Sequence, residues 1–306
     1  MFSSSLKTVC PILTTSNIGR AFMKKAPCIF VHIGAYKTGT TLLQKKIFAF
    51  WPNMTYMNDL WLSYLVLVED NRKYIISNET LYGRPWARNS GLSWAAERQA
   101  IVKALSRLFP DAQILLSLRR HSGLILSLYK QYLHEGGTLK LEQFYDFKKD
   151  RGIIRKAQIF FMDTITLLQE CFERRPFVFT LEEIAGDLPG LLKKLERLFG
   201  EEAPNISGDI GAPVNRGVAY WQGKLLRILN FIDKRPGLFN KRWGLLKLTN
   251  DFTLKHGIDP RTLCQKRLDS LSKRQIRFDA HYEKLVDSYY AEDWEKTKKF
   301  IATYWS

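Results

Sequence analysis

Residues 32–46 read HIGAYKTGTTLLQKK and connect a short apolar run to a segment with a helical pattern. The apolar run, residues 28–34, predicts a buried parallel strand, because it is almost wholly apolar and stops at a glycine. Apolar residues then recur at helical spacing between positions 42 and 50, which predicts a helix over residues 40–51. A strand, a glycine-containing loop and a helix in this order form the opening of an α/β unit.

The loop between this strand and this helix has the features of an anion site. Such a loop presents free backbone N–H groups and the positive end of the helix dipole. Gly34 and Gly39 allow a tight turn and a close approach to a ligand. Charged and hydroxyl donors come from Lys37, Thr38, Thr40 and Thr41. In a Walker A loop the lysine follows the last glycine, whereas Lys37 precedes Gly39, so the loop predicts a phosphate site of another kind.

The α/β pattern continues along the chain. We expect further strands over residues 73–77, 112–118 and 176–181, and helices over 93–109, 122–134 and 188–199. This alternation predicts an α/β fold of three layers, with a mostly parallel central sheet and helices on both faces. We expect a flexible N-terminal segment over 1–24 and one domain over 25–306. Its α/β core covers about 28–217 and its helical C-terminal part 218–306, with a last helix over 281–305.

A second candidate site follows the strand predicted over 112–118. Arg119 and Arg120 come where this strand ends, and ligands of open α/β sheets bind beyond the carboxyl ends of the strands. Ser127 lies eight residues after Arg119, about two turns into the next helix. A guanidinium fork suits a phosphate, and the hydroxyl adds a donor. A capped helix with solvated arginines is an equally open interpretation.

The charge, the cysteines and the apolar runs of the sequence indicate which kinds of partner and site to expect. The 47 Lys and Arg against 30 Asp and Glu give a net charge of +17, which favours anionic partners or simply keeps the surface soluble. The four cysteines form no C-x-x-C pair, so the sequence predicts no zinc site and no redox dithiol, but thiols in a reducing, cytoplasmic location. No apolar run reaches the roughly 18–20 residues of a membrane span.

Together the two motifs resemble those of sulfotransferases that use 3′-phosphoadenosine 5′-phosphosulfate (PAPS). In that family a loop of the type P-K-[ST]-G-[ST]-[ST] holds the 5′-phosphosulfate, and residues 36–41, YKTGTT, match it with Tyr36 in place of proline. The family's R-x₇-S motif holds the 3′-phosphate, and Arg119 and Ser127 match it, although Arg120 and His121 replace the usual Asn-Pro. The resemblance is closest to bacterial-type members and covers about residues 28–217.

The resemblance implies a P-loop NTPase-like sulfotransferase fold, PAPS as co-substrate, and no metal. Residues 37–41 and the Arg119–Ser127 pair would hold the two ends of the nucleotide, and Lys37 would offset charge on the departing 5′-phosphate. Arg216 and Gly217 are similar to a downstream Arg-Gly cofactor contact of the family, and residues 179–184 to its later strand.

A general base must take the proton of the acceptor hydroxyl. Glu79 follows the strand over 73–77 on the same rim, and family members with a glutamate base carry it in a similar region. A carboxylate that starts a helix is the alternative for Glu79. His121 and His134 are reserve candidates, whereas His32 lies inside a strand and is expected to be packed.

The sequence leaves the acceptor open. A hydroxyl or amine of a glycan, a lipid-linked sugar or a small compound fits, and basic and aromatic residues between 234 and 243 form either a glycan groove or a solvated face. A P-loop-type small-molecule kinase is an alternative, but it needs magnesium and a lysine after the glycine. A non-catalytic binder of nucleic acid or another polyanion is a second alternative, and the absence of a nucleic-acid motif disfavours it.

Overall fold

The computed structural model describes residues 28–58, 72–85, 92–135, 137–206, 223–225, 227–228 and 276–305. The predictions for residues 1–24, for Arg216 and Gly217, and for the basic aromatic stretch 234–243 lie outside these residues.

The five described strands form one sheet in the order β2-β3-β1-β4-β5, and every neighbouring pair is parallel. The central strand β1 (Cys28–Gly34) lies between β3 (Lys73–Ser77) and β4 (Gln113–Leu118), while β2 (Met54–Met57) and β5 (Phe177–Thr180) lie outside them. Gly34 pairs with Ser117, so β1 and β4 end at the same edge of the sheet.

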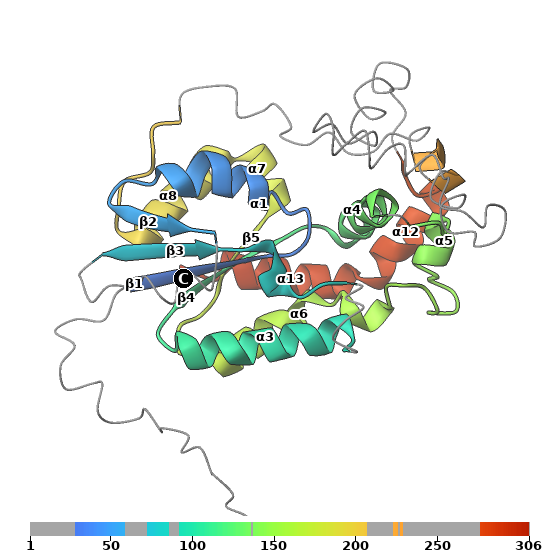
Figure 1. Cartoon of the computed structure of the whole chain (residues 1–306), viewed down its shortest axis with the longest axis horizontal. Coiled ribbons are helices and arrows are strands. Elements are labelled where there is room, and N and C mark those ends of the chain that lie inside the picture. The colour runs from blue at the N-terminus through green and yellow to red at the C-terminus, as the bar shows by residue number, and fades with distance from the viewer. Residues whose placement is uncertain are drawn as a thin grey trace, which may run out of the picture.

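Helices cover both faces of the sheet (Figure 1). One face carries α1 (Thr40–Leu42), α7 (Leu181–Gly186) and α8 (Leu188–Phe199), and the other carries α3 (Trp94–Leu108), α6 (Phe161–Cys171) and α13 (Ala291–Ala302). Successive residues of β1 point to opposite faces of the sheet and belong to two separate apolar clusters. Phe30 belongs to one cluster and Val31 to the other. A strand buried on both faces has this pattern. The three-layer α/β prediction is confirmed.

Further helices lie beyond the carboxyl ends of the strands (Figure 1). They are α4 (His121–His134), α5 (Leu141–Phe144) and α12 (Ala280–Tyr289). The hydroxyls of Tyr145 and Tyr290 lie 2.8 Å apart in the core, and both residues are buried. The C-terminal helices are therefore part of the main core.

The predicted helix over 40–51 is wrong in its details. After α1 the chain widens into a π-helical turn, η1 (Leu43–Ile47), and then tightens into a 3₁₀ turn, η2 (Phe48–Phe50). The Phe48 N–H donates to the Leu43 carbonyl, the i to i+5 bond of a π-helix. The wide turn places Phe48 and Ile47 together on the buried side.

Three other regions differ from the sequence prediction. The helix over 281–305 is two helices, α12 and α13, divided at Tyr290. Within residues 179–184 the strand ends at Thr180, whose hydroxyl accepts a hydrogen bond from Glu183 N and caps α7. The sequence pattern did not predict β2, α5, α6, α7, or the short turns η3 (Glu79–Tyr82) and η4 (Lys156–Gln158).

Candidate functional site at the ends of β1 and β4

The sheet changes its direction of winding between β1 and β4. From β1 the chain passes to β2 on one side of the sheet, and from β4 it passes to β5 on the other side. Two adjacent strands whose connections diverge leave a crevice at their carboxyl ends, and this is where open α/β sheets bind ligands. The loop after β1 and the residue after β4, Arg119, both lie at this point.

The loop after β1 has an unusual backbone. Lys37 has a φ of 60° and Gly39 a φ of 84°, so both adopt the left-handed conformation. For lysine this is uncommon, and such residues gather at functional sites. A side chain on Gly39 would also lie only 3.1 Å from Ile184 Cδ1 of α7. The result is a tight loop with the Lys37 side chain exposed to solvent.

A buried chain of polar groups holds the loop to the sheet. Thr38 Oγ1 donates to the Ala35 carbonyl at 2.6 Å and lies 2.8 Å from Ser117 Oγ. The His32 ring bridges Ser117 Oγ at 3.0 Å and Ser77 Oγ at 2.8 Å. Burial lowers the pKa of His32 to about 3, so this ring is neutral near pH 7. The prediction that His32 is packed is confirmed, and the Thr38 hydroxyl is engaged within the protein.

The other two threonines differ in their surroundings. Thr41 is half-buried, whereas Thr40 is only 4% exposed. Thr40 Oγ1 has no hydrogen-bond partner among the residues that the structure describes. It lies against Gly34, where an added Cβ would clash with it. A buried hydroxyl without a partner costs about 1–3 kcal/mol, and the oxygen of a bound anion would relieve this cost.

Arg119 joins the loop to α4. Its Nη1 atom donates to Ser127 Oγ at 2.6 Å and to the Lys37 carbonyl at 3.4 Å. Burial lowers the pKa of Arg119, and the nearby Glu182 carboxylate opposes this shift. The structure therefore brings together the two motifs that are 82 residues apart in sequence.

Glu79 lies on the same edge of the sheet. It is the first residue of η3, and the preceding Asn78 caps this turn by accepting a hydrogen bond from Thr80 N at 2.9 Å. Burial and then the charge of Glu79 raise the pKa of Tyr36 to about 12. Glu79 thus follows β3 at the edge of the sheet where β1 leads into the loop.

His121 and His134 are the first and the last residue of α4. His121 is 1% exposed, its Nε2 atom is 2.9 Å from Asp293 Oδ2, and its ring stacks on Tyr290 at 4.4 Å. A base must contact the acceptor, so this enclosed ring is unsuited to that role. His134 ends α4, at the opposite end of that helix from Arg119.

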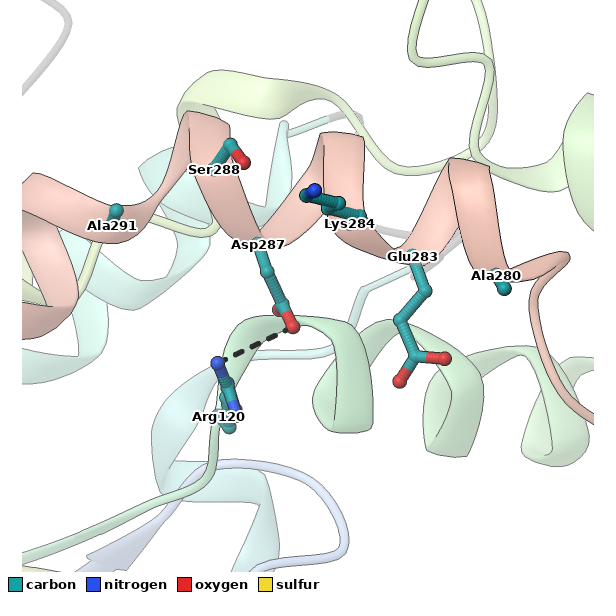
Figure 2. A pocket seen from close by; sticks show the side chains of 7 residues that line it. All are labelled: Arg120, Ala280, Glu283, Lys284, Asp287, Ser288 and Ala291. Carbon is teal, nitrogen blue, oxygen red and sulfur yellow. Dashed lines mark ion pairs between the residues drawn. The ribbon is translucent and has the colours of Figure 1, made fainter.

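A hollow of about 480 Å³ lies beside the site, between α12 and the start of α4 (Figure 2). Arg120 and Asp287 face each other across it with an Nη2–Oδ2 distance of 3.5 Å. Glu283 and Lys284 also line it, so it carries charges of both signs. No local sequence pattern predicts this hollow, because its two sides are more than 150 residues apart. Neither Lys37 nor Arg119 lines it.

Two further features concern the described residues as a group. They contain no cluster of three or more His, Cys, Asp or Glu side chains that could hold a metal ion. None of the helices among them is both long and apolar enough to cross a bilayer. Neither finding extends to the remainder of the chain.

Comparison with known proteins gives limited similarity. No family model and no curated protein matches the chain. A solved sulfotransferase from Alicyclobacillus acidocaldarius is 16% identical, with a TM-score of 0.45, over 60% of this chain and 86% of that chain. A mouse sulfotransferase complexed with PAP is 13% identical, with a TM-score of 0.34, over 86% of this chain and 89% of that chain. The chain is thus similar to solved sulfotransferases at low identity and low TM-score.

Proposed function

We propose that the protein transfers a sulfuryl group from PAPS to a hydroxyl or amine of an acceptor. One observation carries this proposal: Arg119 contacts both the Lys37 loop and Ser127 at the point where the sheet changes direction. The two contacts unite the two motifs of the resemblance in one place. They support two neighbouring positions for phosphate groups, one at the loop and one at Arg119 and Ser127.

The proposal assigns one end of the nucleotide to each position. The loop of residues 37–41 takes the 5′-phosphosulfate, with the Lys37 charge and the buried Thr40 hydroxyl as partners. Arg119 and Ser127 take the 3′-phosphate, which suits a guanidinium fork. A nucleotide with phosphates on both the 5′ and the 3′ oxygen uses both positions, whereas ATP uses only the first.

The reaction breaks the bond between sulfur and the bridging oxygen and forms a bond between sulfur and the acceptor oxygen. The attacking and leaving oxygens must lie nearly in line with sulfur, and the charge on the leaving 5′-phosphate must be offset. The Lys37 ammonium supplies that charge. Glu79 accepts the proton of the acceptor, since it follows β3 at the same edge of the sheet as the loop.

Calorimetry with 3′-phosphoadenosine 5′-phosphate and with ATP–magnesium tests the proposal. We expect tight binding of the first ligand in the presence of a chelator and weaker binding of the second. Binding of ATP–magnesium alone would favour the kinase alternative and would overturn the proposal. Binding of neither, with tight binding of heparin or oligonucleotides, would favour the polyanion binder.

The acceptor class is a second part of the proposal. A glycan or a small hydroxyl compound fits a site that presents a general base at an open edge. Incubation with sulfur-labelled PAPS and a panel of glycans, lipid-linked sugars and small alcohols and amines identifies it. Transfer of label to none of these classes would contradict this part and leave the nucleotide assignment standing on the calorimetry.

A further inference from the structure

Gly123 is the third residue of α4, where glycine is a poor helix former. Arg119, Gly123 and Ser127 are spaced four residues apart, so they lie along one face of this segment. The Arg119 side chain runs along this face from the end of β4 to Ser127 Oγ, a hydrogen bond of 2.6 Å. It must therefore cross the surface of the helix at Gly123.

The space above Gly123 is filled by Arg119. A Cβ added at Gly123 would lie 2.7 Å from Arg119 Nε, 3.4 Å from Cζ and 3.5 Å from Cδ. These are the three nearest atoms, and all belong to the same arginine. Since φ of Gly123 is not positive, the backbone itself does not require glycine at this position.

We propose that Gly123 is a positioning residue, whose missing side chain lets Arg119 lie flat on α4 and so sets the preference of the site for a 3′-phosphate. This inference rests on the proposed function, because that function makes Arg119 and Ser127 the 3′-phosphate position. An arginine is flexible, so the fold tolerates a methyl group at Gly123 by moving the guanidinium away. The movement disturbs the contacts of Nη1 with Ser127 and with the Lys37 carbonyl.

The test compares two alanine variants by calorimetry and thermal unfolding. Gly123→Ala changes the residue beneath Arg119, whereas Gly186→Ala changes a helical glycine at which a Cβ would meet no atom within 4 Å. The ligands are 3′-phosphoadenosine 5′-phosphate and adenosine 5′-phosphate, which differ only in the 3′-phosphate. The measured quantity is the dissociation constant of adenosine 5′-phosphate divided by that of 3′-phosphoadenosine 5′-phosphate. A general loss of stability would not change this ratio.

We expect the ratio to fall about tenfold in Gly123→Ala, as for the weakening of one charged hydrogen bond, with no fall in melting temperature. The ratio in Gly186→Ala should equal that of the natural protein. An unchanged ratio in Gly123→Ala would overturn the inference, and so would an unfolded variant, because the inference requires the fold to tolerate the change. If the natural protein itself binds the two ligands equally, the proposed function fails as well.

Discussion

Arg119 donates a 2.6 Å hydrogen bond to Ser127, and the same Nη1 atom contacts the backbone carbonyl of Lys37 at 3.4 Å. A guanidinium has five N–H donors, and these two contacts use only one nitrogen atom. Arg119 is thereby oriented by the protein while its fork stays suited to a phosphate.

Replacement of Arg119 by lysine tests the need for the fork. Arg119→Lys keeps the charge but loses the planar, two-point geometry, so we expect the affinity for 3′-phosphoadenosine 5′-phosphate to fall about 10- to 100-fold. Calorimetry measures this. Arg120→Lys is the matched control, because Arg120 pairs with Asp287 instead of the loop. Equal losses in the two variants would contradict the assignment of Arg119.

Lys37 is expected to act on the rate more than on binding. In Lys37→Ala the charge opposite the leaving phosphate is lost, and we expect kcat to fall about 10²- to 10³-fold. The positive φ at position 37 is about as unfavourable for alanine as for lysine, so the variant adds little backbone strain. A rate assay with labelled PAPS measures the loss, with the exposed Lys45→Ala as control. Unchanged turnover would remove Lys37 from the mechanism.

Glu79→Gln separates the two interpretations of that carboxylate. If Glu79 accepts the proton, kcat falls about 10²-fold or more while nucleotide affinity stays the same. The exposed Glu142→Gln serves as control. A normal rate with a lower melting temperature would instead support a carboxylate that only stabilises the start of η3.

Ser117→Ala should weaken the attachment of the loop after β1 to the sheet. Ser117 Oγ is the common partner of Thr38 and His32, and its removal leaves buried polar groups with one partner fewer. We expect a loss of about 1–3 kcal/mol in the free energy of unfolding, measured by urea titration. Ser106→Ala removes an exposed hydroxyl from α3 and should cost much less. A cost no greater than that of Ser106→Ala would refute the role of the buried network.

Asp293 gives a pH-dependent prediction. Burial alone would raise its pKa, but hydrogen bonds from His121 and from the N–H groups of Phe161 and Met162 lower it below its usual value. A lowered folded-state pKa means that the stability from this carboxylate is present above its unfolded pKa, about 4, and is lost as pH falls through the folded value.

We therefore expect Asp293→Asn to lose about 3 kcal/mol of stability at pH 7, and the difference from the natural protein to shrink below about pH 4. Urea titrations at pH 7 and pH 3 check both parts. The surface variant Glu295→Gln, at a residue whose side chain is 59% exposed, controls for a simple change of charge. A stability difference between Asp293→Asn and the natural protein that grows towards low pH would contradict this prediction.

The sequence predicted those parts of the fold that depend on local pattern. Strands β1 and β4 are mostly apolar runs of seven and six residues, and the loop after β1 is marked by its glycines and threonines. The four residues of β2 are only half-buried at the edge of the sheet, so they carry no such signal. The R-x₇-S spacing located Arg119 and Ser127, but only the sheet order shows that they face the loop.

The side chains that hold the loop and Arg119 in place could not be predicted from the sequence, for a different reason. Ser77 and Ser117 contact His32 only because their strands flank β1 in register. That register depends on three strands meeting, which no local pattern specifies. The role of Gly123 likewise depends on the path of the Arg119 side chain.

The contact between His121 and Asp293 joins residues that are 172 positions apart. Asp293 also receives the first N–H groups of α6, so it fixes the starts of two helices that precede it in the chain. During synthesis on the ribosome, both helices are made long before their partner. The first turn of α4, next to Arg119, therefore cannot make this contact until translation has passed residue 293 and that segment has left the exit tunnel.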